Sequence, residues 1–207
     1  MFKDRIDAGT ELAEKLLKFK DKKVVVLAIP RGGLPIGAIV AETLKAPLDI
    51  ALTKKIGHPN NKEYAIGAVS LEDMVLNDAK GVTQGYIIEE TKRIRKKLQQ
   101  RYDQYYRKGL PQNVEDKTVI IVDDGIATGN TLLATIELVS KQSPKKIIVA
   151  IPVASRSAIK KLKSISKVHE VICLQVPYNF QAVGQFYEEF GQVSDEEAVG
   201  ILDGFNE

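Results

Sequence analysis

Short apolar runs alternate with amphipathic segments along most of the chain. The runs typical of buried strands cover residues 23–29, 48–53, 119–122, 146–152 and 167–176. Apolar residues recur at helical spacing over residues 7–19, 35–44, 132–139 and 155–162. An unbroken apolar strand indicates burial on both faces, as in a parallel sheet covered by helices. The alternation therefore predicts an α/β fold with a doubly wound, mainly parallel sheet.

The middle and the end of the chain depart from this pattern. Residues 64–71 and 75–76 resemble short strands that could form an antiparallel pair, and residues 86–106 have a long helical pattern. After residue 177 the chain is aromatic and irregular until a short helix predicted over residues 194–202. We interpret residues 1–207 as a single domain with a core at about 23–176, an insert at about 57–115 and a C-terminal segment at about 177–207.

The most informative stretch covers residues 119–131, where an apolar strand runs into Asp123 and Asp124. A loop with two glycines and two threonines follows, and then a helix begins. The first N–H groups of a helix lack intrahelical partners and carry positive potential, so such a loop suits a phosphate. Two carboxylates would repel a phosphate, but they suit sugar hydroxyls or a metal ion. A ligand with a phosphate at one end and a vicinal diol nearby satisfies both halves of the motif.

Other phosphate-binding motifs fit this stretch less well. A Walker A loop requires a lysine that is absent here, and no Rossmann glycine pattern is present. Receiver domains carry a comparable acid pair, but on their first strand rather than past mid-chain. An ordinary βα turn capped by Asn130 or Thr128 would not explain two acids, two glycines and two threonines together.

The stretch resembles the phosphoribosyl-diphosphate (PRPP) binding signature of type I phosphoribosyltransferases. The resemblance implies that Asp123 and Asp124 hold the ribose hydroxyls and are catalytic. It also implies that they bind Mg²⁺, either directly or only through water or the ribose hydroxyls. It implies a 5-phosphate site in the loop at Gly125, Ala127, Thr128, Gly129, Asn130 and Thr131. It further implies transfer of ribose 5-phosphate to a nitrogenous base with release of diphosphate, Mg²⁺ as cofactor, a homodimer, a flexible loop within residues 57–115 and a hood over the site at residues 177–207.

A second strand–loop–helix unit carries Arg31, Gly32 and Gly33. The guanidinium of an arginine offers a fork of donors that suits phosphate oxygens. By the same resemblance this loop binds the diphosphate, and Arg31 assists the leaving group. Lys54 and Lys55 follow the strand at 48–53, where a lysine could meet the same diphosphate, so we include Lys54 among the catalytic residues and both among the PRPP-binding residues.

The acceptor is less defined by the sequence. Tyr178 and Phe180 could stack on a planar base, whereas Phe186, Tyr187 and Phe190 could form the core of the hood. Hypoxanthine-guanine members of the family carry an aspartate where this chain has Ala127, which argues against that subgroup. As a whole, the chain is similar to phosphoribosyltransferase-domain proteins of undefined acceptor, including those fused to esterase-like domains.

Composition adds few constraints. The chain has 207 residues, 44% of them hydrophobic, and a net charge of +3. No apolar stretch reaches the roughly 18 residues that span a membrane, and residues 1–5 open no secretory signal, so we expect a cytoplasmic protein without membrane contact. Basic residues with interleaved tyrosines at 92–108 leave nucleic-acid binding open. The alternative function is a PRPP- or nucleotide-binding regulator of the same fold, without transferase activity.

Overall fold

The computed structural model describes residues 1–77, 79–107 and 109–205. Four residues lie outside the described part of the chain: Asp78 of the expected flexible loop, Lys108 of the basic stretch, and Asn206 and Glu207 at the end of the hood.

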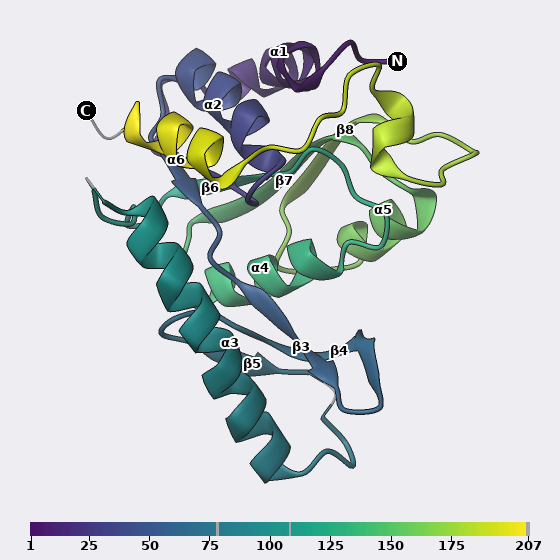
Figure 1. Ribbon diagram of the computed structural model, residues 1–207. Coiled ribbons are helices and arrows are strands. Elements are labelled where there is room, and N and C mark those ends of the chain that lie inside the picture. The colour runs from purple at the N-terminus through teal and green to yellow at the C-terminus, as the bar shows by residue number, and fades with distance from the viewer. Residues whose placement is uncertain (78, 108, 206–207) are drawn as a thin grey trace.

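A five-stranded parallel sheet forms the centre of the molecule (Figure 1). Its strands are β1 (Val24–Ala28), β2 (Leu48–Ile50), β6 (Thr118–Val122), β7 (Lys146–Val153) and β8 (Glu170–Gln175). They lie in the order β2-β1-β6-β7-β8, and every neighbouring pair is parallel. All five carboxyl ends therefore meet at one edge, which is where open α/β sheets bind ligands.

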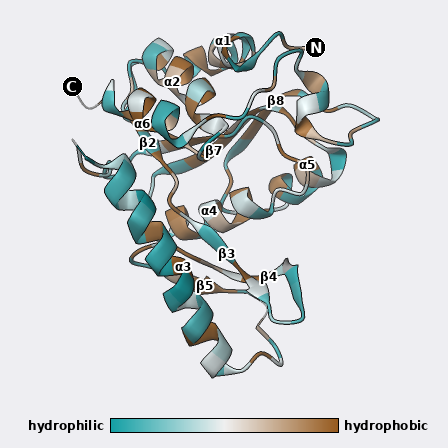
Figure 2. Ribbon diagram, in the orientation of Figure 1, coloured by the Kyte–Doolittle hydropathy of each residue, from teal (hydrophilic) through white to brown (hydrophobic). Residues whose placement is uncertain are grey.

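Helices cover both faces of this sheet, as the unbroken apolar strands predict. Alternate residues of β1 show the division: Val24 and Val26 pack in the cluster that contains α1 (Arg5–Leu16) and α2 (Gly33–Leu44). Val25 and Leu27 pack instead with α4 (Asn130–Ser140) and α5 (Arg156–Lys163). Colouring by hydropathy shows the apolar strands between the polar outer faces of these helices (Figure 2). The predicted doubly wound fold is confirmed.

The insert is a second layer of structure rather than a long loop. An antiparallel sheet is formed by β3 (Lys54–His58), β4 (Asn61–Val69) and β5 (Met74–Leu76). It packs against the 22-residue helix α3 (Gln84–Tyr105). This contact has its own apolar cluster, which contains Ile56, Ile66, Val69, Ile87, Ile94 and Leu98. The helix α3 reaches from the central sheet down along the small sheet (Figure 1).

Two predictions about this region are wrong. The strand predicted over residues 48–53 ends at Ile50, and Lys54 opens β3 of the small sheet instead of ending a core strand. The sequence Gly-His-Pro-Asn-Asn at residues 57–61 predicts a turn-rich loop, but His58 belongs to β3. The antiparallel pairing predicted for residues 64–71 and 75–76 is confirmed as β4 and β5.

Both ends of the chain contribute to the hood at the carboxyl edge of the sheet. The helix α1 continues into the 3₁₀ turn η1 (Leu17–Phe19), and a second such turn, η2 (Val183–Phe186), precedes α6 (Asp195–Asp203). Phe2 pairs in parallel with Tyr187, so the first residues of the chain join the C-terminal segment as one small structure. Within the described residues, no helix is long and apolar enough to cross a membrane.

Candidate active site

The two acids of the central motif lie directly after β6, at the carboxyl edge of the sheet. The backbone N–H of Asp124 donates to Oδ1 of Asp123 over 2.9 Å, which fixes the turn between them. Burial and then the neighbouring charge of Asp124 raise the pKa of Asp123 well above its usual range. Burial also raises the pKa of Asp124, and the hydrogen bond from Arg5 offsets part of that effect.

The predicted phosphate loop opens α4 as its sequence suggests. Gly129 is the N-cap residue of α4 and has a left-handed φ of 74°, a conformation that glycine adopts without strain. No side chain caps this helix, so neither Asn130 nor Thr128 is the cap. Ala127, Thr128 and Thr131 are exposed. The uncapped N–H groups at this helix start are therefore available to an anion.

Close packing requires a glycine at position 125. A Cβ atom there would lie 2.6 Å from Cγ1 of Val183 and 2.9 Å from Cγ1 of Val153. Real Cβ atoms do not approach other atoms so closely, and the hood therefore rests directly on the turn after the two acids.

The loop after β1 lies against these acids. The peptide bond between Pro30 and Arg31 is cis. A Cβ atom on Gly32 would lie 2.0 Å from Oδ2 of Asp124, and one on Gly33 would lie 2.8 Å from the carbonyl oxygen of Val122. Two loops that are about 90 residues apart in the sequence thus meet at the carboxyl edge. The two strands that carry them, β1 and β6, are direct neighbours.

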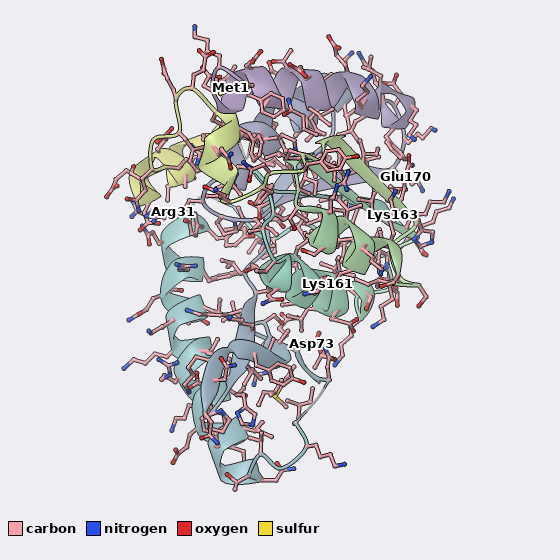
Figure 3. The ribbon with its side chains drawn as sticks, turned by 90° about the vertical axis from the view of Figure 1, so that its right-hand side faces the viewer. Met1, Arg31, Asp73, Lys161, Lys163 and Glu170 are labelled. Carbon is pink, nitrogen blue, oxygen red and sulfur yellow. The ribbon has the colours of Figure 1, made fainter. Side chains whose placement is uncertain are left out.

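Arg31 extends from this loop toward α6 and the end of α3. Its Nη1 lies 3.6 Å from Oδ1 of Asp195, the first residue of α6. The hydroxyl of Tyr105 donates to the same Oδ1 over 3.2 Å. Burial and Asp195 raise the pKa of Tyr105 to about 12, so its hydroxyl stays protonated at neutral pH. Figure 3 shows Arg31 where the C-terminal segment and α3 meet.

Lys54 and Lys55 do not lie at the carboxyl end of a strand of the central sheet, since both belong to β3 of the small sheet. Partial burial lowers the pKa of Lys54, and the neighbouring charges of Lys97 and Arg101 on α3 lower it further. Lys54 is therefore part of a cluster of basic groups on the insert. Its role in catalysis stays a prediction.

The two aromatic residues predicted to meet an acceptor have different surroundings. Tyr178 is 88% exposed, and the guanidinium of Arg156 lies 3.4 Å from the centre of its ring. Phe180 stacks on Phe186 with ring centres 5.3 Å apart and packs against the main core cluster. Phe180 thus contributes to the packing of the hood, and its contact with an acceptor base stays a prediction.

Arg5 is a site residue that the sequence reasoning missed. Its Nε and Nη2 donate to Oδ2 of Asp124 over 3.0 and 2.8 Å, and its Nη1 donates to the carbonyl oxygen of Gly191 over 2.7 Å. Arg5 lies in the first turn of α1, far from the motif in the sequence, and nothing in its local pattern indicates a partner. The hydroxyl of Tyr187 also reaches this turn and donates to the carbonyl oxygen of Asp124 over 2.6 Å.

The chain belongs to the phosphoribosyl transferase domain family, whose profile matches residues 2–187. The family, the parallel sheet and the loop after β6 together confirm the type I phosphoribosyltransferase fold.

Individual relatives agree with this family. A protein of Mycobacterium tuberculosis, provisionally named a phosphoribosyl transferase, is 37% identical over 98% of this chain. The chain spans 46% of the length of that relative. The crystal structure of the protein TT1426 from Thermus thermophilus superposes with a TM-score of 0.92 at 38% identity, over 99% of this chain and 98% of the other. A uracil phosphoribosyltransferase of Mycoplasma genitalium is 41% identical over 30% of this chain and 29% of its own length.

Proposed function

We propose that this domain transfers ribose 5-phosphate from PRPP to a nitrogenous base and releases diphosphate. One arrangement carries the proposal. The glycine loop after β1 lies against Asp124, and the loop that follows Asp124 ends at the uncapped start of α4. A diphosphate site, a diol site and a 5-phosphate site would then follow one another along the carboxyl edge. That order matches the order of groups around the ribose of PRPP.

Each group has a separate task in this proposal. The backbone from Gly125 to Thr131 binds the 5-phosphate, and Gly32 and Gly33 let the backbone approach the diphosphate closely. Arg31 stabilises negative charge on the leaving diphosphate. Lys54 and Lys55 would contact the same diphosphate when the insert closes toward the site. Asp123 and Asp124 hold the ribose hydroxyls and place negative charge near a cationic sugar ring.

Mg²⁺ fits the donor set of these acids. Magnesium prefers oxygen ligands, usually one or two carboxylates completed by water and substrate phosphates. Among the described residues, Oδ2 of Asp123 and Oδ1 of Asp124 accept no hydrogen bond from a protein donor. Neither oxygen is a fully buried atom without a partner. The described part of the chain holds no cluster of three or more acidic, histidine or cysteine ligands. When bound with PRPP, the ion would neutralise charge on the diphosphate.

The acceptor, the assembly and the location belong to the same proposal. The acceptor is a planar base in the hood near Tyr178, and Ala127 disfavours the hypoxanthine-guanine subgroup, as the resemblance implies. The homodimer is carried by the resemblance as well, and the cytoplasmic location by the sequence expectation. Binding of nucleic acid by the basic stretch that begins at residue 92 stays a secondary hypothesis, supported by exposed side chains at Lys92, Lys96 and Lys97.

The test is titration of PRPP by calorimetry with and without Mg²⁺, beside ribose 5-phosphate and AMP. We expect PRPP to bind in a Mg²⁺-dependent manner, and screening of nucleobases should then reveal an acceptor by diphosphate release. In the double variant Asp123→Asn/Asp124→Asn, transfer should fall by at least about 100-fold while the unfolding transition is retained. Wild-type turnover in that variant would remove these acids from the mechanism. Binding of the monophosphates without PRPP would instead support the regulatory alternative.

A further inference from the structure

The N-terminal segment, residues 2–9, is anchored at each step along its length. The N–H of Phe2 donates to the carbonyl oxygen of Phe186 over 2.8 Å, and the N–H of Glu188 donates back to Phe2 over 2.9 Å. The side chain of Phe2 is fully buried, with its ring centre 5.3 Å from that of Tyr187. The segment is therefore held to the hood as a strand is held in a sheet.

The start of α1 is fixed immediately afterwards. The side chain of Asp4 accepts hydrogen bonds from the N–H groups of Ile6 and Asp7, which makes it the N-cap. One turn later, a Cβ atom on Gly9 would lie 2.9 Å from Cδ1 of Ile39 and 3.3 Å from Cα of Ile36. The helices α1 and α2 thus pack backbone to backbone at this point. Arg5, between the cap and this contact, has little freedom in its backbone.

The side chain of Arg5 is enclosed as closely as its backbone. Two of its nitrogens donate to one oxygen of Asp124, and a third donates to Gly191. The guanidinium carbon lies 4.0 Å from the centre of the Phe190 ring. The side chains of Arg5 and Asp124 are 12% and 14% exposed, so the pair is largely shielded from water and salt.

We propose that Arg5 is a positioning residue for the ribose-binding acid Asp124, an inference that rests on the proposed function. By holding Oδ2 of Asp124, Arg5 fixes the carboxylate against Gly32 and leaves Oδ1 for the ligand. Without Arg5, the carboxylate of Asp124 would face that of Asp123 with no cation beside it, and it would turn away through its side-chain torsions. Arg5 thereby links α1 and the hood to the donor site.

A lysine cannot replace Arg5 in this arrangement. The ammonium group is a point charge, whereas the planar guanidinium donates in two directions at once and stacks on an aromatic ring. The side chain of Arg5 uses both properties. Its nitrogens donate to Asp124 and Gly191, and its guanidinium carbon lies over the ring of Phe190.

The experiment is a double-mutant cycle on PRPP affinity with the variants Arg5→Ala, Arg5→Lys, Asp124→Asn and Arg5→Ala/Asp124→Asn. The matched control is Arg95→Ala, because Arg95 likewise donates to two residues, through the carbonyl oxygens of Ser70 and Glu72, but lies on α3 in the insert. We expect Arg5→Ala to weaken PRPP binding by at least about tenfold, with little recovery in Arg5→Lys and no change in Arg95→Ala. The double variant should bind no more weakly than Asp124→Asn alone, because Arg5 acts through that carboxylate.

Two results would overturn the inference. Unchanged PRPP affinity in Arg5→Ala would show that the pair has only a structural role, which a loss of thermal stability would then measure. A double variant much weaker than Asp124→Asn would show that Arg5 contacts the ligand directly. Failure of the wild-type protein to bind PRPP would reject the proposed function instead. In that case, crystal structures of the wild type and Arg5→Ala still decide the matter: an unmoved Asp124 carboxylate in the variant refutes the positioning role.

Discussion

At the scale of single residues, the site depends on glycines that leave room for a neighbour. Gly32 has an ordinary φ of −60°, so its identity is not required by its backbone conformation. What requires a glycine is the Asp124 carboxylate, whose Oδ2 would lie 2.0 Å from an added Cβ atom. Sequence alone suggests that a glycine beside Arg31 permits unusual angles, but the structure gives a different reason.

The variant Gly32→Ala tests this reason. The added methyl group must displace the Asp124 carboxylate, which would break its hydrogen bonds with Arg5. We expect PRPP affinity to fall by at least about tenfold, with a stability loss of about 1–3 kcal/mol from overpacking. Calorimetric titration and urea denaturation measure the two effects. Gly85→Ala is the control, because no atom lies within 4 Å of a Cβ there. Full PRPP affinity in Gly32→Ala would contradict the close contact.

At the scale of elements, the helix α5 beside the phosphate loop is fixed by its N-cap residue. Ser155 caps α5 by accepting from the N–H of Ala158 over 3.1 Å. Its hydroxyl also donates to the carbonyl oxygen of Ala127 over 2.5 Å. One side chain therefore orders both a helix start and the predicted phosphate loop.

We expect Ser155→Ala to reduce both stability and affinity. Loss of the cap should cost about 1 kcal/mol of unfolding free energy. Loss of the bond to Ala127 frees the loop, so the Kd for PRPP should rise severalfold. Ser194→Ala is the matched control, since Ser194 caps α6 through the N–H of Glu197 without contacting the phosphate loop. Equal effects of the two variants on PRPP affinity would show that Ser155 acts only as a cap.

The elements that the sequence predicts well are those with local signals. The apolar run before Asp123, the glycine-containing loop before α4 and the helical pattern at residues 155–162 are all visible in short windows, and the structure contains all three elements. The strand β3 was missed because His58, Pro59 and Asn60 look like a turn, and because its pairing with β4 is visible only in three dimensions. Arg5 was missed for the same reason, since its partner is 119 residues away.

At the scale of the whole molecule, one buried acid joins the insert to the core. Asp49 on β2 is 4% exposed. Its carboxylate accepts from the N–H groups of Ile50 and Gln112 over 2.7 and 2.6 Å, and from the hydroxyl of Tyr106, which ends α3. Burial raises the pKa of Asp49 above its ordinary value in spite of these donors. Asp49 thus favours the folded state most below its unfolded pKa, and this contribution is lost as the pH rises through the folded pKa.

The variant Tyr106→Phe should therefore destabilise the protein in a pH-dependent manner. Removing a donor from a buried carboxylate costs about 1–3 kcal/mol when that carboxylate is ionised. The loss should therefore be larger at pH 7 than at pH 4, because lowering the pH protonates the carboxyl group. Urea denaturation at both pH values measures it, with Tyr102→Phe as control, because Tyr102 stacks on Tyr106 at 4.8 Å without reaching Asp49. A loss of the same size at both pH values would exclude the carboxylate as the cause.

The contact between Arg5 and Gly191 has a consequence for the biosynthesis of the chain. The two residues are 186 positions apart, so Arg5 makes this contact only after Gly191 has been synthesised. A ribosome adds residues at roughly 5–20 per second, and domains form as their parts emerge. The central strands can pair well before residues 183–193 have left the ribosome. During that interval a nascent chain can have the sheet and both acids, but Arg5 lacks its bond to Gly191 until residues 183–193 have emerged.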